Sequence, residues 1–243
     1  MLDALKDIVK HTSNLGFIDT VKVIGTAATT KLETKDPDNS VIIYAEMYQP
    51  IKGIETTLGL SRLGILKGLL GLHEGSTATI VTENRNNVDV PTEITLDNGD
   101  GFVSNYRFMS ESMVNEQIKV PPFKGANWDV VTIPSKSAIT LLNDNNGILG
   151  ATEKRFTVAT DAKGTLKFSI GSGPTDRTVI PFAKNVTGTL KNGRSYPLTQ
   201  VLSILKLTDS ASSSSMSFND NGLLMIEIDS GIGKYSYMIP GAK

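Results

Sequence analysis

Most of the chain alternates apolar with polar residues, which is the pattern of β-strands that bury one face. Turn sequences such as DNGDG, DAKG, NDNG and DSGIG separate many of these runs. The chain therefore predicts a protein built mainly on antiparallel sheets. The alternating runs are DTVKVIG, SVIIYAEMY, TATIVTE, TEITL, FVSNYRF, KRFTVAT, GTLKFSI, RTVIPFA, SMSFND, LLMIEID and KYSYMI.

Four other stretches repeat their apolar residues at the spacing of a helix. In the third stretch Ser135 can act as the N-cap, and in the fourth Pro197 stands where a first helical turn tolerates proline. We expect each helix to bury its apolar side against a sheet. The four stretches are residues 2–11, 60–72, 135–146 and 196–209.

The helical stretches are spaced in a way that indicates an internal duplication. The first and third begin at residues 2 and 135, which are 133 positions apart, and the second and fourth begin at 61 and 198, 137 apart. TEITLDNGDGFVSNYRF also matches MIEIDSGIGKYSYMI near the C-terminal end. We therefore predict two duplicated domains, residues 1–117 and 129–243, joined by an extended, proline-containing connector at 118–128.

The second helical stretch, LSRLGILKGLLGL, has one narrow side. Ser61, Gly64, Gly68 and Gly71 form a stripe of small residues, with Lys67 beside it. Such a stripe either admits another backbone at close range or faces an open space. On a helical wheel Arg62 falls within the apolar arc, so its charged end is expected to reach outward to water.

Composition limits the classes of function. The chain has 243 residues, 39% of them apolar, and a net charge of −1, so any attraction to nucleic acid must come from local clusters of Lys and Arg. Without cysteine there is no disulfide framework or thiol nucleophile. No run is apolar enough for a membrane span, and the first residues do not have the pattern of a signal peptide, so we expect no membrane association.

The candidates for catalytic or metal chemistry are weak. His11 and His73 each end a helix, where a cation stabilises the helix dipole. LDNGDG at 96–101 lacks the ligand spacing of a calcium loop and predicts a hairpin turn, and GSGPTD at 171–176 lacks the lysine of a phosphate loop. We expect no enzyme activity, no metal and no cofactor.

Two segments carry a resemblance to a known family. The C-terminal run YPLTQVLSILKLTDSASSSSMSFNDNGLLMIEIDSGIGKYSYMIPGAK is similar to the end of the eukaryotic and archaeal proliferating-cell nuclear antigen. The segment YRFMSESMVNEQIKVPPFKGANWDVVTIPSKSAITLLN is similar to the middle of the trimeric clamps of T-even-type phages. Together with the duplication, these segments make the chain resemble the DNA sliding clamps, which are processivity factors of replicative polymerases.

The resemblance implies an α+β fold of two duplicated clamp domains, each with antiparallel sheets and two helices, that assembles as a homotrimer into a pseudo-sixfold ring. The helices would line a hole that encircles duplex DNA, and weak phosphate contacts would let the ring slide. Asp3 and Asp7 are expected to offset Lys6 and Lys10 in part on the first helix. The expected DNA-facing residues are Lys6, Lys10, Arg62, Lys67, Lys136, Arg194 and Lys206.

The same resemblance implies partner proteins. A DNA polymerase and a clamp loader would dock through short peptides beside the connector, and edge strands in TVIPFAK and FVSNYRF would pair between subunits. The expected peptide pocket consists of Val120, Pro121, Pro122, Phe123, Met238, Ile239 and Pro240. The expected subunit interface consists of Val103, Tyr106, Phe108, Val179, Ile180 and Phe182.

Two other classes of protein remain as alternatives. A viral structural ring or tube protein, from a tail or baseplate, also uses duplicated antiparallel domains but needs no lysine on its helices. A carbohydrate-active enzyme needs a carboxylate pair beside an aromatic platform, whereas the single tryptophan, Trp128, lies in the connector. The resemblance to phage clamps favours a bacteriophage source and the cytoplasm of an infected bacterium.

Overall fold

A computed structural model describes residues 1–85, 87–173 and 176–242, and these form two compact units. Unit 1 contains Met1–Pro37, Ile43–Pro121 and Gly231–Tyr235. Unit 2 contains Asp38–Ile42, Pro122–Ser230 and the residues from Ser236 onward. The chain thus passes between units inside segment 118–128, and each unit takes in short segments from elsewhere in the sequence. The linear division into 1–117 and 129–243 stays a prediction.

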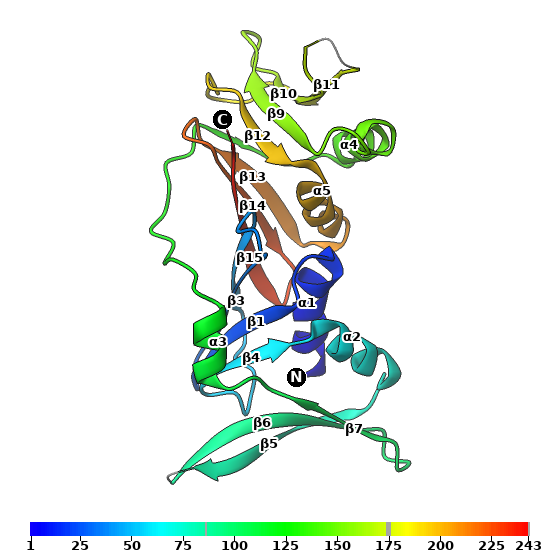
Figure 1. Cartoon of the computed structure of the whole chain (residues 1–243), viewed down its shortest axis with the longest axis vertical. Coiled ribbons are helices and arrows are strands. Elements are labelled where there is room, and N and C mark those ends of the chain that lie inside the picture. Colours follow the sequence, from blue (N-terminus) through cyan, green and yellow to red (C-terminus); the bar gives the residue numbers. More distant parts are fainter. Residues whose placement is uncertain (86, 174–175, 243) are drawn as a thin grey trace. The chain divides into compact units, whose positions relative to one another are not determined.

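Unit 1 is a layer of strands with helices on both faces. Its strands follow the orders β4-β1-β2-β3 and β5-β6-β7. Helices α1 and α2 lie together on one face of these strands and α3 on the other (Figure 1). The elements are α1 (Leu2–His11), a short 3-10 turn (Ser13–Leu15), β1 (Thr20–Gly25), β2 (Thr30–Lys35), β3 (Ile42–Met47), β4 (Thr57–Ser61), α2 (Leu63–Leu72), β5 (Thr77–Arg85), β6 (Val88–Asp97), β7 (Val103–Arg107) and α3 (Glu111–Gln117).

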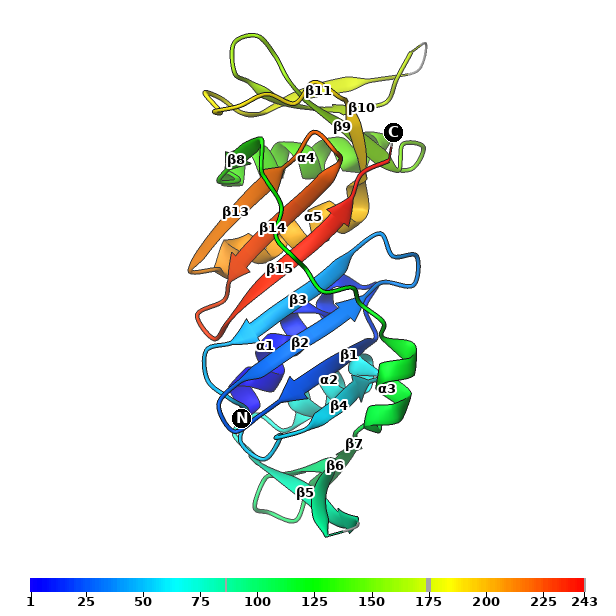
Figure 2. The same cartoon turned by 90° about the vertical axis from the view of Figure 1, so that its left-hand side faces the viewer.

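Unit 2 repeats the strands and the first two helices of this plan, adds one strand, and has no counterpart of α3 among its described residues. Its strands follow the orders β12-β9-β10-β11 and β8-β13-β14-β15, and α4 and α5 pack together (Figure 2). The elements are β8 (Val130–Thr132), α4 (Lys136–Leu149), β9 (Arg155–Thr160), β10 (Leu166–Ile170), β11 (Thr178–Ala183), β12 (Arg194–Pro197), α5 (Leu198–Lys206), a 3-10 turn (Leu207–Ser210), β13 (Ser213–Phe218), β14 (Leu223–Asp229) and β15 (Gly233–Pro240), whose residues up to Tyr235 belong to unit 1.

The predicted duplication is confirmed element by element. In the described residues each unit runs through a helix, four strands, a second helix and three strands, and only unit 2 has a further strand, β8, ahead of its first helix. Even the isolated bridges correspond, since Gly59 of β4 pairs with Met109 just after β7, and Ser195 of β12 pairs with Ala242 just after β15. The α+β fold class is therefore confirmed as well.

Several element predictions need correction. The second helix begins at Leu63, because Leu60 and Ser61 belong to β4. Pro197 ends β12 and caps α5 instead of standing in its first turn. Helix α3 was not predicted, because Val114 is its only buried side chain and one apolar position shows no periodicity. Strand β2 was not predicted, because two of its three buried positions are threonine. Strands β4, β8 and β12 were not predicted because they are short.

Candidate nucleic-acid interface

Helix α1 presents lysines outward and one of its two aspartates inward. Its buried face includes Leu5 and Ile8, while Lys6 is partly exposed and Asp3 is exposed. Asp7 is only 7% exposed, so of the two aspartates only Asp3 lies on the outer surface of α1 with the lysines. The outer surface of α1 is consequently more basic than the sequence indicated.

Asp7 is held inside unit 1 by an aromatic residue from the other end of the chain. The Tyr235 hydroxyl donates to Asp7 Oδ2 at 2.8 Å, and the His11 ring stacks on the Tyr235 ring with centroids 4.1 Å apart. Asp7 Oδ1 lies 3.7 Å from His11 Nε2, beyond a good hydrogen bond. Burial lowers the pKa of His11 to about 4, and the charge of Lys10 acts in the same direction. His11 is therefore neutral at pH 7, and its predicted role as a cation at the helix end is wrong.

A shallow hollow of about 300 Å³ between α1 and α2 brings two predicted lysines together. Lys6 of α1 and Lys67 of α2 both line it, next to Val9 and Leu70, and Glu74 supplies an opposing charge. Two cations from different helices thus share one surface of unit 1. A DNA phosphate placed there would be attracted by both lysines, and such a contact does not depend on the base sequence.

The glycine side of α2 faces open space. Leu63, Leu66 and Leu70 are buried, whereas a Cβ added to Gly64, Gly68 or Gly71 would meet no heavy atom within 4 Å. Of the two alternatives for this stripe, the close approach of another backbone is therefore not what the described residues show, and the stripe faces open space. Arg62 precedes the helix, in the left-handed conformation with φ 55°, and is exposed, so it is not part of the apolar arc.

The helices of unit 2 carry fewer cations. Lys136 and Lys206 are exposed, at the start of α4 and the end of α5. Lys136 Nζ lies 3.5 Å from Asp209 Oδ1, but both side chains are largely in water, where such a pair contributes little. The predicted N-cap is confirmed, because the Ser135 hydroxyl accepts the Ala138 N–H at 3.2 Å.

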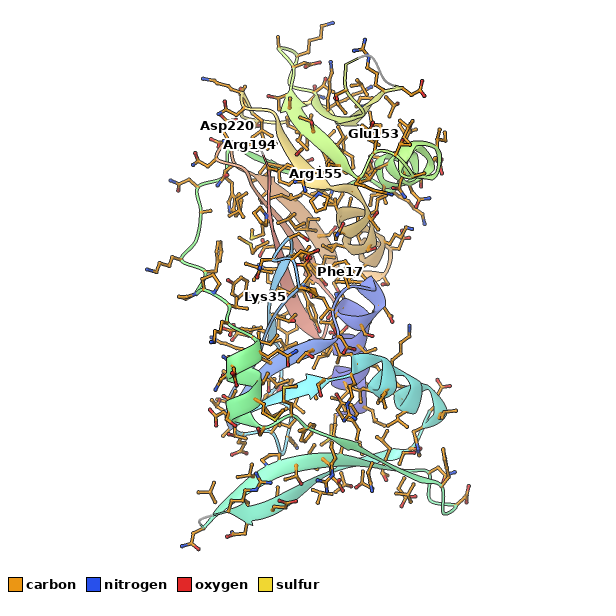
Figure 3. The ribbon with its side chains drawn as sticks, in the orientation of Figure 1. Phe17, Lys35, Glu153, Arg155, Arg194 and Asp220 are labelled. Atoms are coloured by element: carbon orange, nitrogen blue, oxygen red, sulfur yellow. The ribbon has the colours of Figure 1, made fainter. Side chains whose placement is uncertain are left out.

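Arg194 was predicted on a pore helix, and this is wrong. It lies in β12, and a Cβ added to Gly222 would stand 3.3 Å from its Cδ and Nε. Asp220 lies nearby (Figure 3). Among the described residues, Arg194 Nε is a buried nitrogen without a hydrogen-bond partner. Burial raises the pKa of the neighbouring Tyr196 to about 12, while the positive charge of Arg194 acts against that shift.

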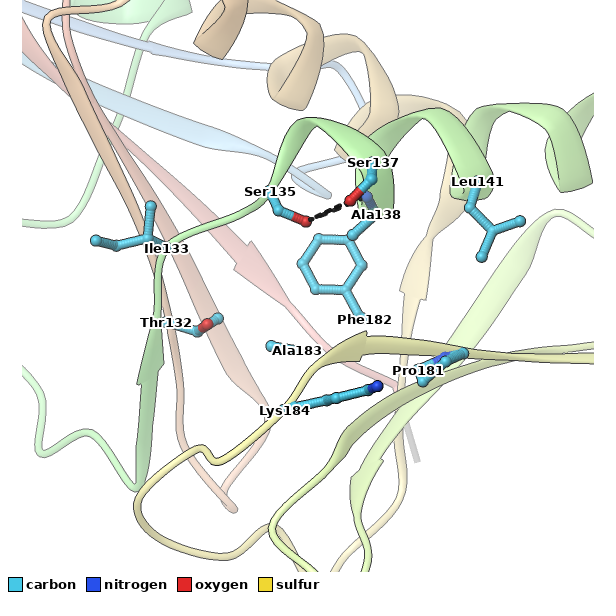
Figure 4. Close-up of a pocket in the computed structure, with 10 residues that line it drawn as sticks. All are labelled: Thr132, Ile133, Ser135, Ser137, Ala138, Leu141, Pro181, Phe182, Ala183 and Lys184. Carbon is cyan, nitrogen blue, oxygen red and sulfur yellow. Dashed lines mark hydrogen bonds between the residues drawn. The ribbon is translucent and has the colours of Figure 1, made fainter.

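A cavity of about 460 Å³ lies in unit 2 between β11 and the first turns of α4 (Figure 4). Ile133 and Leu141 at this cavity are 75% and 43% exposed, which is unusual for large apolar side chains. The sequence pattern did not single out either residue. Together they form an apolar surface beside β11, which is an edge strand of its sheet.

The six residues predicted at the subunit interface differ in their exposure. Val103 of β7 and Val179 of β11 are 49% and 54% exposed. Tyr106, Ile180 and Phe182 are buried inside their own units, and the Tyr106 hydroxyl donates to the Ser61 carbonyl. These three can join an interface only through their main chains. Phe108 is partly exposed.

The connector residues are more exposed than the C-terminal residues with which they were grouped. Pro121, Pro122 and Phe123 are exposed, Val120 is partly exposed, and the Tyr44 hydroxyl donates to the Pro121 carbonyl. At the other end Pro240 is exposed, but Met238 and Ile239 are 4% and 0% exposed. A peptide pocket made by all seven residues stays a prediction.

The second histidine, His73, is held by neighbouring side chains inside unit 1. His73 is buried, with its ring nitrogens 3.1 Å from Ser76 Oγ and 2.8 Å from Ser104 Oγ, and it stacks on Phe102. No three His, Asp or Glu side chains among the described residues meet as a metal site requires. None of the described helices has the length and apolar character needed to cross a bilayer.

The two loop motifs have different outcomes. At LDNGDG the carboxylate of Asp97 and the amide oxygen of Asn98 accept the N–H groups of Gly99, Asp100 and Phe102, so the predicted hairpin turn is confirmed. GSGPTD lies partly outside the described residues.

Neither a protein-family model nor a curated protein matches the sequence. Solved structures do match. A structure described as the C-terminal region of FEN-1 bound to A. fulgidus PCNA aligns with a TM-score of 0.71 at 10% identity, covering 100% of this chain and 96% of that one. The chain has the sliding-clamp fold. PCNA from Entamoeba histolytica aligns with a TM-score of 0.69 at 13% identity, covering 98% of this chain and 94% of that one.

A third sliding clamp gives the same result. PCNA from Thermococcus kodakaraensis aligns with a TM-score of 0.69 at 13% identity, covering 100% of this chain and 97% of that one. Because these likenesses extend over nearly the full length of both chains, the clamp fold includes both units and not one repeat alone.

Proposed function

We propose that this protein is a DNA sliding clamp, a homotrimeric ring that encircles duplex DNA and tethers the replicative polymerase without catalysing a reaction. The observation that carries the proposal is the full-length sliding-clamp fold. The resemblance to T-even-type phage clamps supports a bacteriophage source, with the cytoplasm of an infected bacterium as the place of action.

The distribution of cations supports weak contact with DNA. Lys6 and Lys67 share one surface of unit 1, Lys136 and Lys206 are exposed in unit 2, and Asp7 is withdrawn into the interior. A sliding ring needs attraction to phosphates that is independent of sequence and weak enough to allow movement. A few lysines per subunit that contact phosphates, without side chains that recognise bases, are suited to that requirement.

Two further surfaces support the proposed assembly. Ring closure would pair the edge strand β11 with β7 of a second copy, with Val179, Val103 and the cavity beside α4 covered by the contact. Polymerase and loader peptides would dock at the exposed Phe123 and Pro240. The FEN-1 region bound to A. fulgidus PCNA shows that a clamp of this fold accepts a partner segment.

The first test is the mass in solution over a range of protein concentrations. Three copies of the 26.1 kDa chain give about 78 kDa, the mass expected of the closed ring. A mass of six copies or more would contradict the clamp and favour a tube-forming structural protein. A Val179→Asp variant should lower the mass, because the charge would be buried at the proposed interface.

The second test measures DNA binding as a function of salt. Each lysine occurs three times in a trimer, so Lys67→Ala should reduce the slope of log K against log salt by up to about three, at roughly 0.9 per lost phosphate contact. The full test set is Lys6, Lys67, Lys136 and Lys206 changed to Ala. The matched control set changes Lys119, Lys124, Lys163 and Lys191, which are exposed and lie outside α1, α2, α4 and α5. Equal slopes for both sets would contradict a DNA-facing helix layer.

A further inference from the structure

The two repeats differ at one sheet edge, the outer edge of β5. In unit 2, strand β8 pairs antiparallel with the equivalent strand β13, through Met216↔Thr132, Ser217↔Val131 and Phe218↔Val130. In unit 1, α1 begins at Leu2, and no described strand pairs with the outer edge of β5. The edge of β13 in unit 2 is therefore covered by a strand, whereas the equivalent edge of β5 in unit 1 is not covered by any described strand.

The strand registers give the equivalent residues. Thr77 of β5 pairs with Asp97, and Ser213 of β13 pairs with Asp229. Three residues further along each strand, Ile80 pairs with Ile94 and Met216 pairs with Ile226. Counted along the strands, residues 80–82 of β5 therefore correspond to residues 216–218, which β8 covers. The pairing of β5 with β6 shifts register between Val81 and Thr82, and the pairing of β13 with β14 does not.

Burial differs between the two repeats at these equivalent positions. Met216, Ser217 and Phe218 are 0%, 3% and 0% exposed. At the equivalent positions Ile80 is partly exposed, Val81 is 36% exposed and Thr82 is exposed. Segment 80–82 thus consists of three β-branched residues, of which Val81 and Thr82 are exposed and Ile80 is partly exposed, whereas its counterpart is buried.

The main chain of β5 is also available at this place. Thr92 Oγ1 donates to the Val81 carbonyl at 3.3 Å, so that carbonyl faces β6. Since main-chain groups alternate sides along a strand, the N–H and C=O of Ile80 face the open edge. The run TATIVT at 77–82 has no charge and no proline, which are two of the features that protect an edge. Glu83 and Arg85 beyond it form an ion pair at 2.8 Å.

We propose that the outer edge of β5 at residues 80–82 binds an extended strand of a partner protein, which adds antiparallel to the sheet as β8 adds to β13. The partner segment would be uncharged and rich in β-branched residues, as VVT is in β8, and its main chain would supply most of the affinity. This site is separate from the strands β7 and β11 assigned above to ring closure, so it does not depend on the proposed ring.

The probe is a capped peptide that copies residues 127–134, NWDVVTIP. Hydrogen exchange of the full-length protein is measured with and without it, and we expect the Ile80 amide to exchange about tenfold more slowly when the peptide is bound. The control peptide carries N-methyl groups at both valines and the threonine, which removes its main-chain donors, and should give no protection.

A second variant tests the site within one chain. The sequence NWDVVTIPS placed ahead of Leu2 reproduces the spacing between β8 and α4, and it should protect β5 and prevent binding of the peptide. A glycine-serine prefix of equal length should do neither. Unchanged exchange of residues 77–82 with both the peptide and the prefix would overturn the proposal. Protection that grows with protein concentration alone would overturn it as well, because a second copy would then occupy the edge.

Discussion

The buried contact between Tyr235 and Asp7 can be tested by Tyr235→Phe, which removes one hydroxyl and leaves the ring. Tyr235 is 0% exposed, Asp7 is 7% exposed, and their oxygens are 2.8 Å apart, so water cannot replace the lost donor. A hydrogen bond to a charged group contributes about 1.5–3 kcal/mol, and this degree of burial places the loss near the upper end of that range. We expect the free energy of unfolding to fall by about 2–3 kcal/mol.

The assay is urea unfolding at pH 7, with tyrosine fluorescence and far-UV circular dichroism recorded in parallel. With a slope of about 2–3 kcal/mol per molar, the midpoint should fall by about 1 M while the slope is unchanged. Tyr48→Phe is the control, because Tyr48 is 51% exposed and its change should cost less than about 0.5 kcal/mol. In a double-mutant cycle with Asp7→Asn, a coupling energy near zero would refute the reasoning.

Three further predictions follow from named contacts. Lowering the pH from 7 to 5 should reduce the free energy of unfolding by about 2 kcal/mol through His11, because its pKa of about 4 in the folded protein is below the unfolded value and the unfolded chain therefore gains the proton first. His11→Gln should flatten this part of the stability profile measured by urea unfolding, and an equally steep profile in the variant would contradict the prediction. Gly59→Ala should lower the melting temperature, because the added Cβ would stand 2.9 Å from Met109 Cβ. Gly68→Ala has open space around it and should raise the free energy of unfolding by up to about 1 kcal/mol, so equal effects of the two changes would argue against the placement of these glycines. Of the two aspartates of α1, Asp3 is exposed and Asp7 is buried, so Asp3→Asn should strengthen binding of duplex DNA at low salt in an anisotropy titration and Asp7→Asn should not. Stronger binding by both variants would show that Asp7 reaches the surface.

Periodicity predicted the parts of the fold where apolar residues repeat clearly. Helix α1 has the predicted limits, and the spacing of the helices revealed the duplication. Strand β2 and helix α3 were missed for one physical reason. The inward positions of β2 include Thr30 and Thr34, and α3 buries only Val114, so neither segment shows a distinct apolar face.

The site was harder to predict than the fold, because a side chain's environment depends on segments distant in sequence. Asp7 has the spacing of a surface residue, but inside unit 1 it accepts a hydrogen bond from Tyr235, 228 positions away. Arg194 lies just before a helix in sequence, yet it belongs to a strand that ends at Pro197. The apolar surface at Ile133 and Leu141 combines a loop with one helix face, which no single periodic pattern reveals.

The membership of Gly231–Tyr235 in unit 1 has a consequence for synthesis of the protein. A ribosome synthesises nearly the whole polypeptide before Tyr235 emerges. Asp7 and His11 therefore lack their contacts with Tyr235 while most of unit 2 is still being synthesised. Contacts of such long sequence separation form slowly, because a long loop must close first. The first half of the chain is therefore expected to mature last, and a fragment ending at Pro121 should retain α1 with its buried polar residues open to water.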